Sequence, residues 1–270
     1  MTGWIKPENI AYLELKGPDA VRFLNGQISN NVSGDLSKKV VTACVCTMKG
    51  KVDAVIRVTA GNGPESLLIE VDKAQEEAVL ARLDRYLIAD DCEFIESPEV
   101  SDVTHIIAES IDHPGAREHW RYGLKGFDVF GEVDTSGLTE LELTDLLAQK
   151  ILHGIPEYGF EISGEEFPAS LGLDKWAVDF HKGCYLGQEI VSRIESAGKI
   201  PKKLRLFLTT KPYEKGATFS DANGKEIAAA TRDSVPHPDQ QDTFLTPLLA
   251  KDSFAKEGFE EIAILYPPKL

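Results

Sequence analysis

Short β-rich runs alternate with amphipathic stretches along the first part of the chain. Apolar residues in continuous or alternating runs predict strands at 10–16, 40–47, 52–59, 67–71, 92–95 and 103–108. Apolar residues at helical spacing predict helices over 20–24, 73–88 and 139–153. The residues from Met48 to Lys51 form a predicted hairpin turn between two of the strands. Helices and strands are therefore interleaved.

The last part of the chain has a different pattern. Residues 187–196 form a predicted helix, with Glu189 and Arg193 as an ion pair one turn apart. After Pro201, short runs at 204–209, 226–231 and 261–266 are separated by Gly, Pro and Asp, which is typical of a small antiparallel barrel or sandwich. We therefore predict a domain boundary near residue 200.

Two segments lack a periodic pattern. The polar stretch 112–120 is expected to be a surface loop, with His113 and His119 in solvent. The stretch 154–173 is long for a connection without regular structure, which indicates a binding loop.

Composition and charge narrow the class of protein. The chain has 270 residues, of which 42% are hydrophobic and 27% are charged, as in ordinary globular proteins. It has neither an apolar stretch of membrane-spanning length nor a secretory signal at its start. The formal net charge of -15 disfavours bulk binding to nucleic acid. A basic cluster leaves two interpretations open, a solvated strand edge or an anion site; its members are Lys199, Lys202, Lys203 and Arg205.

The four cysteines are Cys44, Cys46, Cys92 and Cys184. A chain of this length needs no disulfides, so a reducing cytoplasm is the expected compartment. Cys44 and Cys46 are two positions apart on a predicted strand and therefore point to the same face. Because no further ligand pair lies nearby, we expect buried core thiols there and no metal site.

Cys184 lies in a turn between Gly183 and Gly187, just before a predicted helix. The positive end of the helix dipole and the neighbouring Lys182 both favour a thiolate. The local run is equally compatible with a reactive thiol and with a small buried hydrophobic residue.

The run from Phe180 to Leu204 closely resembles the signature of the YgfZ family of folate-binding proteins. Its matching positions are Lys182, Gly183, Cys184, Tyr185, Gly187, Gln188, Glu189 and Arg193. Further matches lie at 13–32, 43–54 and 153–174, so the resemblance covers roughly residues 10–210.

The YgfZ family is related to the aminomethyltransferase (T-protein) of the glycine cleavage system. The resemblance implies an α+β fold of intertwined T-protein-like folate-binding domains over residues 1–200, with a split or inserted subdomain near 50–135. It implies a short C-terminal antiparallel β-barrel over residues 201–270. It also implies tetrahydrofolate or a derivative in a central pocket, and no stably bound metal.

The functional role implied by this resemblance is support of the assembly or repair of iron–sulfur enzymes, including tRNA-modifying ones, through Cys184. The implied partners are folate and iron–sulfur enzymes or assembly proteins. The resemblance does not fix the folate contacts; the candidates for them are Tyr12, Asp72, Tyr185 and Gln188.

Two departures from the T-protein pattern argue against aminomethyl transfer. T-proteins carry a Lys-Asp-Phe-Ile-Gly-type run at the place of residues 182–187, and a catalytic Asp that has no counterpart after Asp72. Two alternatives stay open, a folate-dependent one-carbon transferase or demethylase, and a non-catalytic module that docks a partner through the Cys184 loop. Whether the protein is an enzyme is therefore also open.

Overall fold

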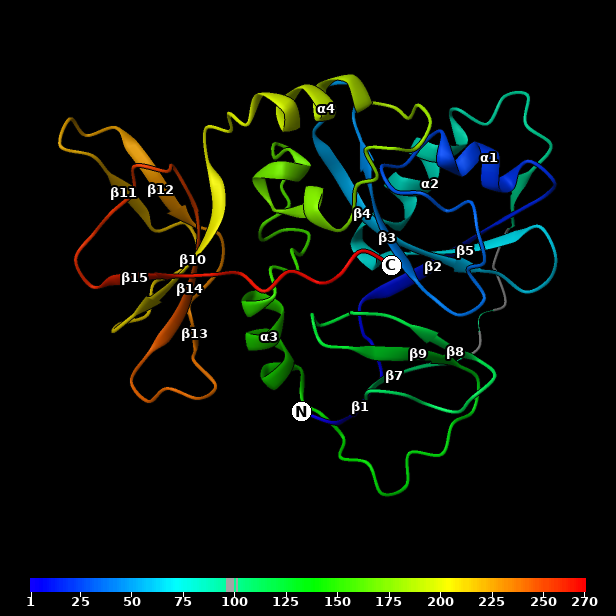
Figure 1. Ribbon diagram of the computed structural model, residues 1–270, viewed down its shortest axis with the longest axis horizontal. Helices are drawn as coiled ribbons and strands as arrows, with labels where there is room; N and C mark the ends of the chain where they lie inside the picture. The colour runs from blue at the N-terminus through cyan, green and yellow to red at the C-terminus, as the bar shows by residue number, and fades with distance from the viewer. Residues whose placement is uncertain (96–99, 101) are drawn as a thin grey trace.

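The computed structural model describes residues 1–95, 100 and 102–270. The described residues form three antiparallel sheets (Figure 1). The first sheet has the strand order β3-β4-β5-β2-β6. Its strands are β2 (Ile10–Lys16), β3 (Val41–Cys46), β4 (Val52–Ala60), β5 (Ser66–Asp72) and β6 (Glu93–Ile95). Its helices are α1 (Ala20–Asn25), the 3-10 turn η1 (Lys73–Gln75) and α2 (Glu76–Asp84). Leu24 of α1 and Leu83 of α2 are fully buried in the same core as Leu15 and Ile69 of the sheet.

The second sheet contains the first strand of the chain. Its order is β1-β7-β9-β8, with β1 (Gly3–Ile5), β7 (Val103–Ile107), β8 (Ala116–Glu118) and β9 (Gly126–Phe130). The chain therefore starts in this sheet, crosses to the first sheet for β2 to β6, and returns for β7 to β9. This crossing is the intertwining expected from the sequence.

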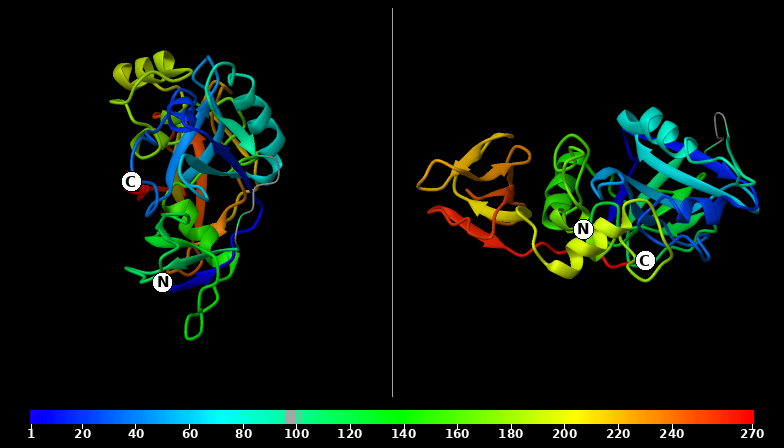
Figure 2. Two further views of the ribbon diagram at one scale, coloured as in Figure 1. Left: turned by 90° about the vertical axis from the view of Figure 1, so that its right-hand side faces the viewer. Right: turned by 90° about the horizontal axis from the view of Figure 1, so that it is seen from above.

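The third sheet is C-terminal and lies at one end of the molecule (Figure 2). Its order is β11-β12-β14-β10-β15, and β13 also pairs with β14. The strands are β10 (Lys203–Thr209), β11 (Thr218–Ser220), β12 (Glu226–Ala230), β13 (Val235–Pro236), β14 (Phe244–Ala250) and β15 (Phe259–Ile262). Within the part of the chain that the structure describes, β11 and β15 do not pair with each other, so the sheet is open. The closed barrel predicted from the sequence is not confirmed.

Helix α3 (Leu143–Leu152) lies between the C-terminal sheet and the other two sheets (Figure 1). Its Leu146 packs with Ile5 and Ile107 of the second sheet, whereas its Ile151 packs with Leu206 and Leu245 of the third sheet. The remaining helical elements are η2 (Pro168–Ser170), η3 (Leu173–Lys175) and α4 (Gln188–Ala197). After β15 the C-terminal tail returns across the molecule toward the first sheet.

Most predicted elements are present within a few residues of their expected ends. The helix predicted over 73–88 begins as a 3-10 turn and ends at Asp84, and the strand predicted at 261–266 lies at Phe259–Ile262. The predicted loop 112–120 contains strand β8, since pairing with β9 imposes an extended backbone on a polar segment.

Residues 96–99 and 101 of the expected subdomain near 50–135 lie outside the described residues, and both domain boundaries stay predictions. In the described part of the chain, no helix is long and apolar enough to cross a membrane.

Candidate functional site

A central cavity of about 560 Å³ lies where the three sheets meet around α3. The first sheet contributes Val55 and Arg57, α3 contributes Leu147 and Lys150, and the C-terminal region contributes Arg232. The predicted binding loop 154–173 also lines it, through residues 156–158, 160 and 162. A cavity of this volume is suited to a ligand of the size of a cofactor.

The cavity has a buried floor and an aromatic mouth. Tyr122 and Ile162 are buried at the floor, whereas Tyr158 and Phe160 are 43% and 46% exposed. The guanidinium of Arg232 lies 4.5 Å from the centre of the Phe160 ring. Exposed aromatic rings at the entrance of a cavity can stack on a planar ligand.

Carboxylates hold the cations of one cavity wall in place. Arg232 Nε and Nη2 donate to the two carboxylate oxygens of Glu161 at 2.7 and 2.6 Å, and Nη1 donates to Glu157 at 2.8 Å. Lys150 forms an ion pair with the same Glu157. The wall is therefore rigid, and its charges are locally balanced.

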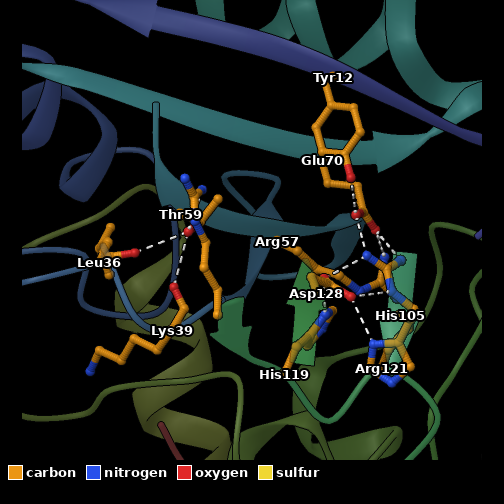
Figure 3. A network of polar contacts seen from close by, with 11 residues as sticks. Tyr12, Leu36, Lys39, Arg57, Thr59, Glu70, His105, His119, Arg121 and Asp128 are labelled. Atoms are coloured by element: carbon orange, nitrogen blue, oxygen red, sulfur yellow. Dashed lines mark hydrogen bonds and ion pairs between the residues drawn. The ribbon is translucent and has the colours of Figure 1, made fainter. Parts of the chain in front are cut away.

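A buried polar network lies behind the floor of the cavity (Figure 3). Arg121 donates to both oxygens of Glu70 at 2.7 and 2.5 Å and to both oxygens of Asp128 at 3.1 and 2.8 Å. Glu70 also accepts from Tyr12 at 3.0 Å and from Arg57 at 3.2 Å. Because Arg57 and Arg121 both line the cavity, the network fixes the position of two cations at its floor.

Two histidines complete the network on the side of Asp128. Nδ1 of His105 lies 2.7 Å and Nδ1 of His119 lies 2.6 Å from the carboxylate oxygens of Asp128. Burial lowers the pKa of His119 to about 4, so this ring is neutral near pH 7 and donates through Nδ1. Although burial favours the neutral acid, Arg121 holds the pKa of Glu70 down at about 2.

His105, His119 and Asp128 are close enough together to suggest a metal site. However, the guanidinium of Arg121 donates to both Asp128 oxygens, so it competes for the same ligand atoms and repels a cation. We therefore assign the cluster to an ion-pair network. His119, expected in a solvated loop, is buried directly after β8, where its main-chain N–H donates to Gly126 O of β9. No spacing pattern in the sequence could have shown this, since the partners come from different strands.

Cys184 lies at a second, separate cavity. Its side chain is exposed, and it lines a volume of about 580 Å³ together with residues of α1 and of the segment after it, including Arg22, Asn25 and Asn31. Among the described residues, the lining of this cavity shares no member with that of the central cavity. The thiol is thus accessible, but it does not open into the central cavity.

The turn around Cys184 is anchored on both sides. Tyr185 is buried, and its burial beside Cys46 and Cys44 raises its pKa. Gly187 has φ 85°, and a Cβ there would lie 2.4 Å from the main-chain oxygen of Thr47. The turn therefore requires glycine at this position, as the two flanking glycines suggested.

The other predicted site residues are divided between the central cavity, the buried network and the Cys184 turn. Of the four candidates for folate contacts, Asp72 lines the central cavity, whereas Tyr12 belongs to the buried network and Tyr185 and Gln188 lie at the Cys184 turn. Glu189 and Arg193 form the predicted ion pair on the exposed side of α4, with a distance of 2.5 Å.

The cysteine pair and the basic cluster singled out in the sequence have packing and ion-pair contacts in the fold. Cys44 and Cys46 are free, fully buried thiols in one core cluster, on the same side of β3 as predicted. Three of the four basic residues form ion pairs at or just before β10, which is an internal strand of the third sheet: Lys202–Glu226 at 2.6 Å, Lys203–Asp252 at 3.9 Å and Arg205–Glu261 at 2.5 Å. Since these three cations already have carboxylate partners, the structure favours neither a free anion site nor a solvated strand edge.

The chain is similar to curated proteins that are named IBA57 homolog or YgfZ. It is 27% identical over 241 residues to the mitochondrial iron–sulfur cluster assembly factor IBA57 homolog of Pyricularia oryzae, covering 83% of this chain and 61% of the relative. For the IBA57 homolog of Coccidioides immitis the identity is 28% over 236 residues, covering 75% and 56%. For the tRNA-modifying protein YgfZ of Colwellia psychrerythraea it is 24% over 247 residues, covering 80% and 74%. The chain thus spans about three fifths of the length of the fungal relatives.

No protein-family model matches the chain. Among solved structures, it is similar to the glycine cleavage system aminomethyltransferase T of Bartonella henselae, with a TM-score of 0.74 at 13% identity. The match covers 92% of this chain and 78% of that one, and at this identity it shows the fold alone. The chain is therefore similar in sequence to the IBA57 and YgfZ proteins and has the fold of aminomethyltransferase T.

Proposed function

We propose that the protein binds tetrahydrofolate or a derivative in the central cavity and supports the assembly or repair of iron–sulfur enzymes, including tRNA-modifying ones, through Cys184. The observation that carries the folate part is the cavity itself, which combines an aromatic mouth with fixed cations at its floor. The names of the relatives, an iron–sulfur assembly factor and a tRNA-modifying protein, support the rest.

The chemistry of the cavity fits a folate. A folate combines a flat heterocycle, which has hydrogen-bond donors and acceptors at its edge, with an aromatic linker and glutamate carboxylates. Tyr158 and Phe160 offer faces for a flat ring, and Arg57 offers donors to an acceptor. When bound, the folate supplies a one-carbon carrier, and the protein residues bind, orient and shield it.

A folate-dependent transferase is the second candidate, because Asp72 lines the central cavity and could accept a proton there. A partner-binding module is the third, because Cys184 is exposed on an open cavity of its own. Product formation from tetrahydrofolate and a methylated amine would favour the transferase.

A titration of the purified protein with tetrahydrofolate tests the cavity. We expect saturable binding, and an increase in Kd of at least about tenfold for Phe160→Ala, the equivalent of a lost stacking contact of about 1.4 kcal/mol. Cys184→Ala and the exposed control Met48→Ala should both retain the wild-type Kd. Absence of saturable binding by the wild type would reject the folate assignment.

Complementation tests the thiol. In cells lacking the protein, Cys184→Ala should leave the activity of iron–sulfur enzymes as low as the empty vector does, whereas the control Cys92→Ala should restore it. Full restoration by Cys184→Ala would reject the role of the thiol. The cytoplasmic compartment stays a prediction, since the IBA57 relatives are named mitochondrial.

A further inference from the structure

The ammonium group of Lys182 is surrounded by oxygens of one turn. Its Nζ donates to the main-chain oxygens of Asn30 at 2.7 Å, Ile28 at 2.8 Å and Asn25 at 2.9 Å, and it lies 3.2 Å from Oδ1 of Asn25. Asn25 is the last residue of α1, and a cation at the C-terminal end of a helix is stabilised by the helix dipole. A single side chain therefore satisfies three main-chain oxygens of the turn 25–30.

The turn 25–30 is held against the segment 176–186 by further hydrogen bonds on both sides of Lys182. Leu186 N donates to Gly26 O at 3.3 Å, and Asp179 N donates to Ser29 O at 2.8 Å. Ser29 Oγ donates to Ala177 O at 2.7 Å. The turn and the segment carrying Cys184 consequently form one unit, and the cavity beside the thiol is bounded by both of them.

We infer that Lys182 is a positioning residue for Cys184. Its ammonium fixes the turn 25–30 against the Cys184 loop and so builds the cavity into which the thiol opens. The relevance of this to iron–sulfur enzymes rests on the proposed function, but the positioning itself does not.

This role differs from the one expected from the sequence, in which the charge of Lys182 stabilises a thiolate. The N–H groups of the ammonium are directed at the turn oxygens. Burial lowers the pKa of Lys182 to about 8, so near pH 7 most molecules still carry the third proton that the three main-chain oxygens require. Replacement by a neutral residue of similar length should therefore release the turn.

The experiment compares Lys182→Met, Lys182→Ala, Lys182→Arg and Lys38→Met in a Cys92→Ser background. Lys38 is the matched control, since its Nζ contacts a single main-chain oxygen, that of Pro114, at 3.3 Å. Amide hydrogen exchange of the turn 25–30 and the alkylation rate of Cys184 by N-ethylmaleimide are measured. For Lys182→Met we expect exchange at least tenfold faster in this turn and alkylation at least threefold faster, because the reagent reaches a loop no longer held against α1.

Rescue separates positioning from general stability. Lys182→Arg should restore at least half of the protection, and ethylammonium added to Lys182→Ala should slow both rates toward wild type, whereas potassium should not. Lys38→Met should behave as wild type, and the tetrahydrofolate Kd should be unchanged in every variant. Wild-type exchange and alkylation in Lys182→Met would overturn the inference, as would faster exchange throughout the protein.

Failure of the proposed function has a different signature. If Cys184→Ala supports iron–sulfur enzymes fully, the proposed function is rejected while the exchange result still decides the role of Lys182.

Discussion

At the scale of single residues, buried charges are satisfied by groups from several strands. Glu70 of β5 and Asp128 of β9 share the guanidinium of Arg121, which joins the first sheet to the second. Removing one partner of such a cluster leaves a buried charge uncompensated, which typically costs about 3–5 kcal/mol. The network therefore makes the floor of the central cavity depend on correct docking of the two sheets.

The pKa of His119 predicts how stability depends on pH. Burial lowers it from 6.5 to about 4, so the unfolded chain binds more protons between these two values. The free energy of unfolding should therefore fall by on the order of 3 kcal/mol as the pH decreases from 6.5 to 4. At still lower pH the free energy of unfolding should decrease further, because the carboxylate of Glu70, with a pKa lowered to about 2, becomes protonated in the folded protein.

Urea unfolding at several pH values measures this dependence. His119→Gln should flatten the curve between pH 6.5 and 4, whereas His113→Gln should not, because His113 contacts Gly115 and Glu132 outside the network. Equal slopes in the wild type and His119→Gln would contradict the assignment.

At the scale of elements, the junction of the Cys184 turn with α4 depends on one glycine. Gly187 is the N-cap of α4, with φ 85°, and faces the main-chain oxygen of Thr47 in the hairpin between β3 and β4. By contrast, a Cβ at Gly183 would meet no atom within 4 Å. The two glycines that flank Cys184 thus have different roles.

Gly187→Ala should destabilise the protein by about 2–4 kcal/mol, because it combines an unfavourable φ with a clash against backbone. Gly183→Ala, the matched control, should change stability by no more than about 0.5 kcal/mol. Chemical denaturation of both variants gives the comparison, and equal effects would show that the close approach to Thr47 is not what requires glycine.

At the scale of the whole molecule, the C-terminal tail holds the third sheet to the rest of the protein. The Tyr266 ring packs where Gly154 and Gly172 leave room for it, and Lys175 lies 3.9 Å above its centre. Further along, Lys269 donates to Val178 O at 2.8 Å. The central cavity is formed between parts that this tail helps to keep together.

Tyr266→Ala should therefore lower stability by about 2 kcal/mol, less than for a fully buried aromatic residue because Tyr266 is only half-buried. It should also weaken tetrahydrofolate binding, although Tyr266 does not line the cavity. Leu265→Ala is the control, since this side chain is 58% exposed. Calorimetry and the folate titration check both effects; a stable Tyr266→Ala protein with wild-type Kd would contradict the role of the tail.

The amino-acid sequence by itself determined the local structure: the strands from their apolar runs, the turn at Cys184 from its two glycines, and the similarity to YgfZ from the run around it. Only the tertiary structure decided which other parts of the chain these elements contact. Lys182 and Asn25 are 157 positions apart, and Arg121 and Glu70 are 51 apart. Periodicity shows which face of an element is buried but not which element covers it, so the buried network, the role of Lys182 and the separation of the two cavities became visible only in the fold.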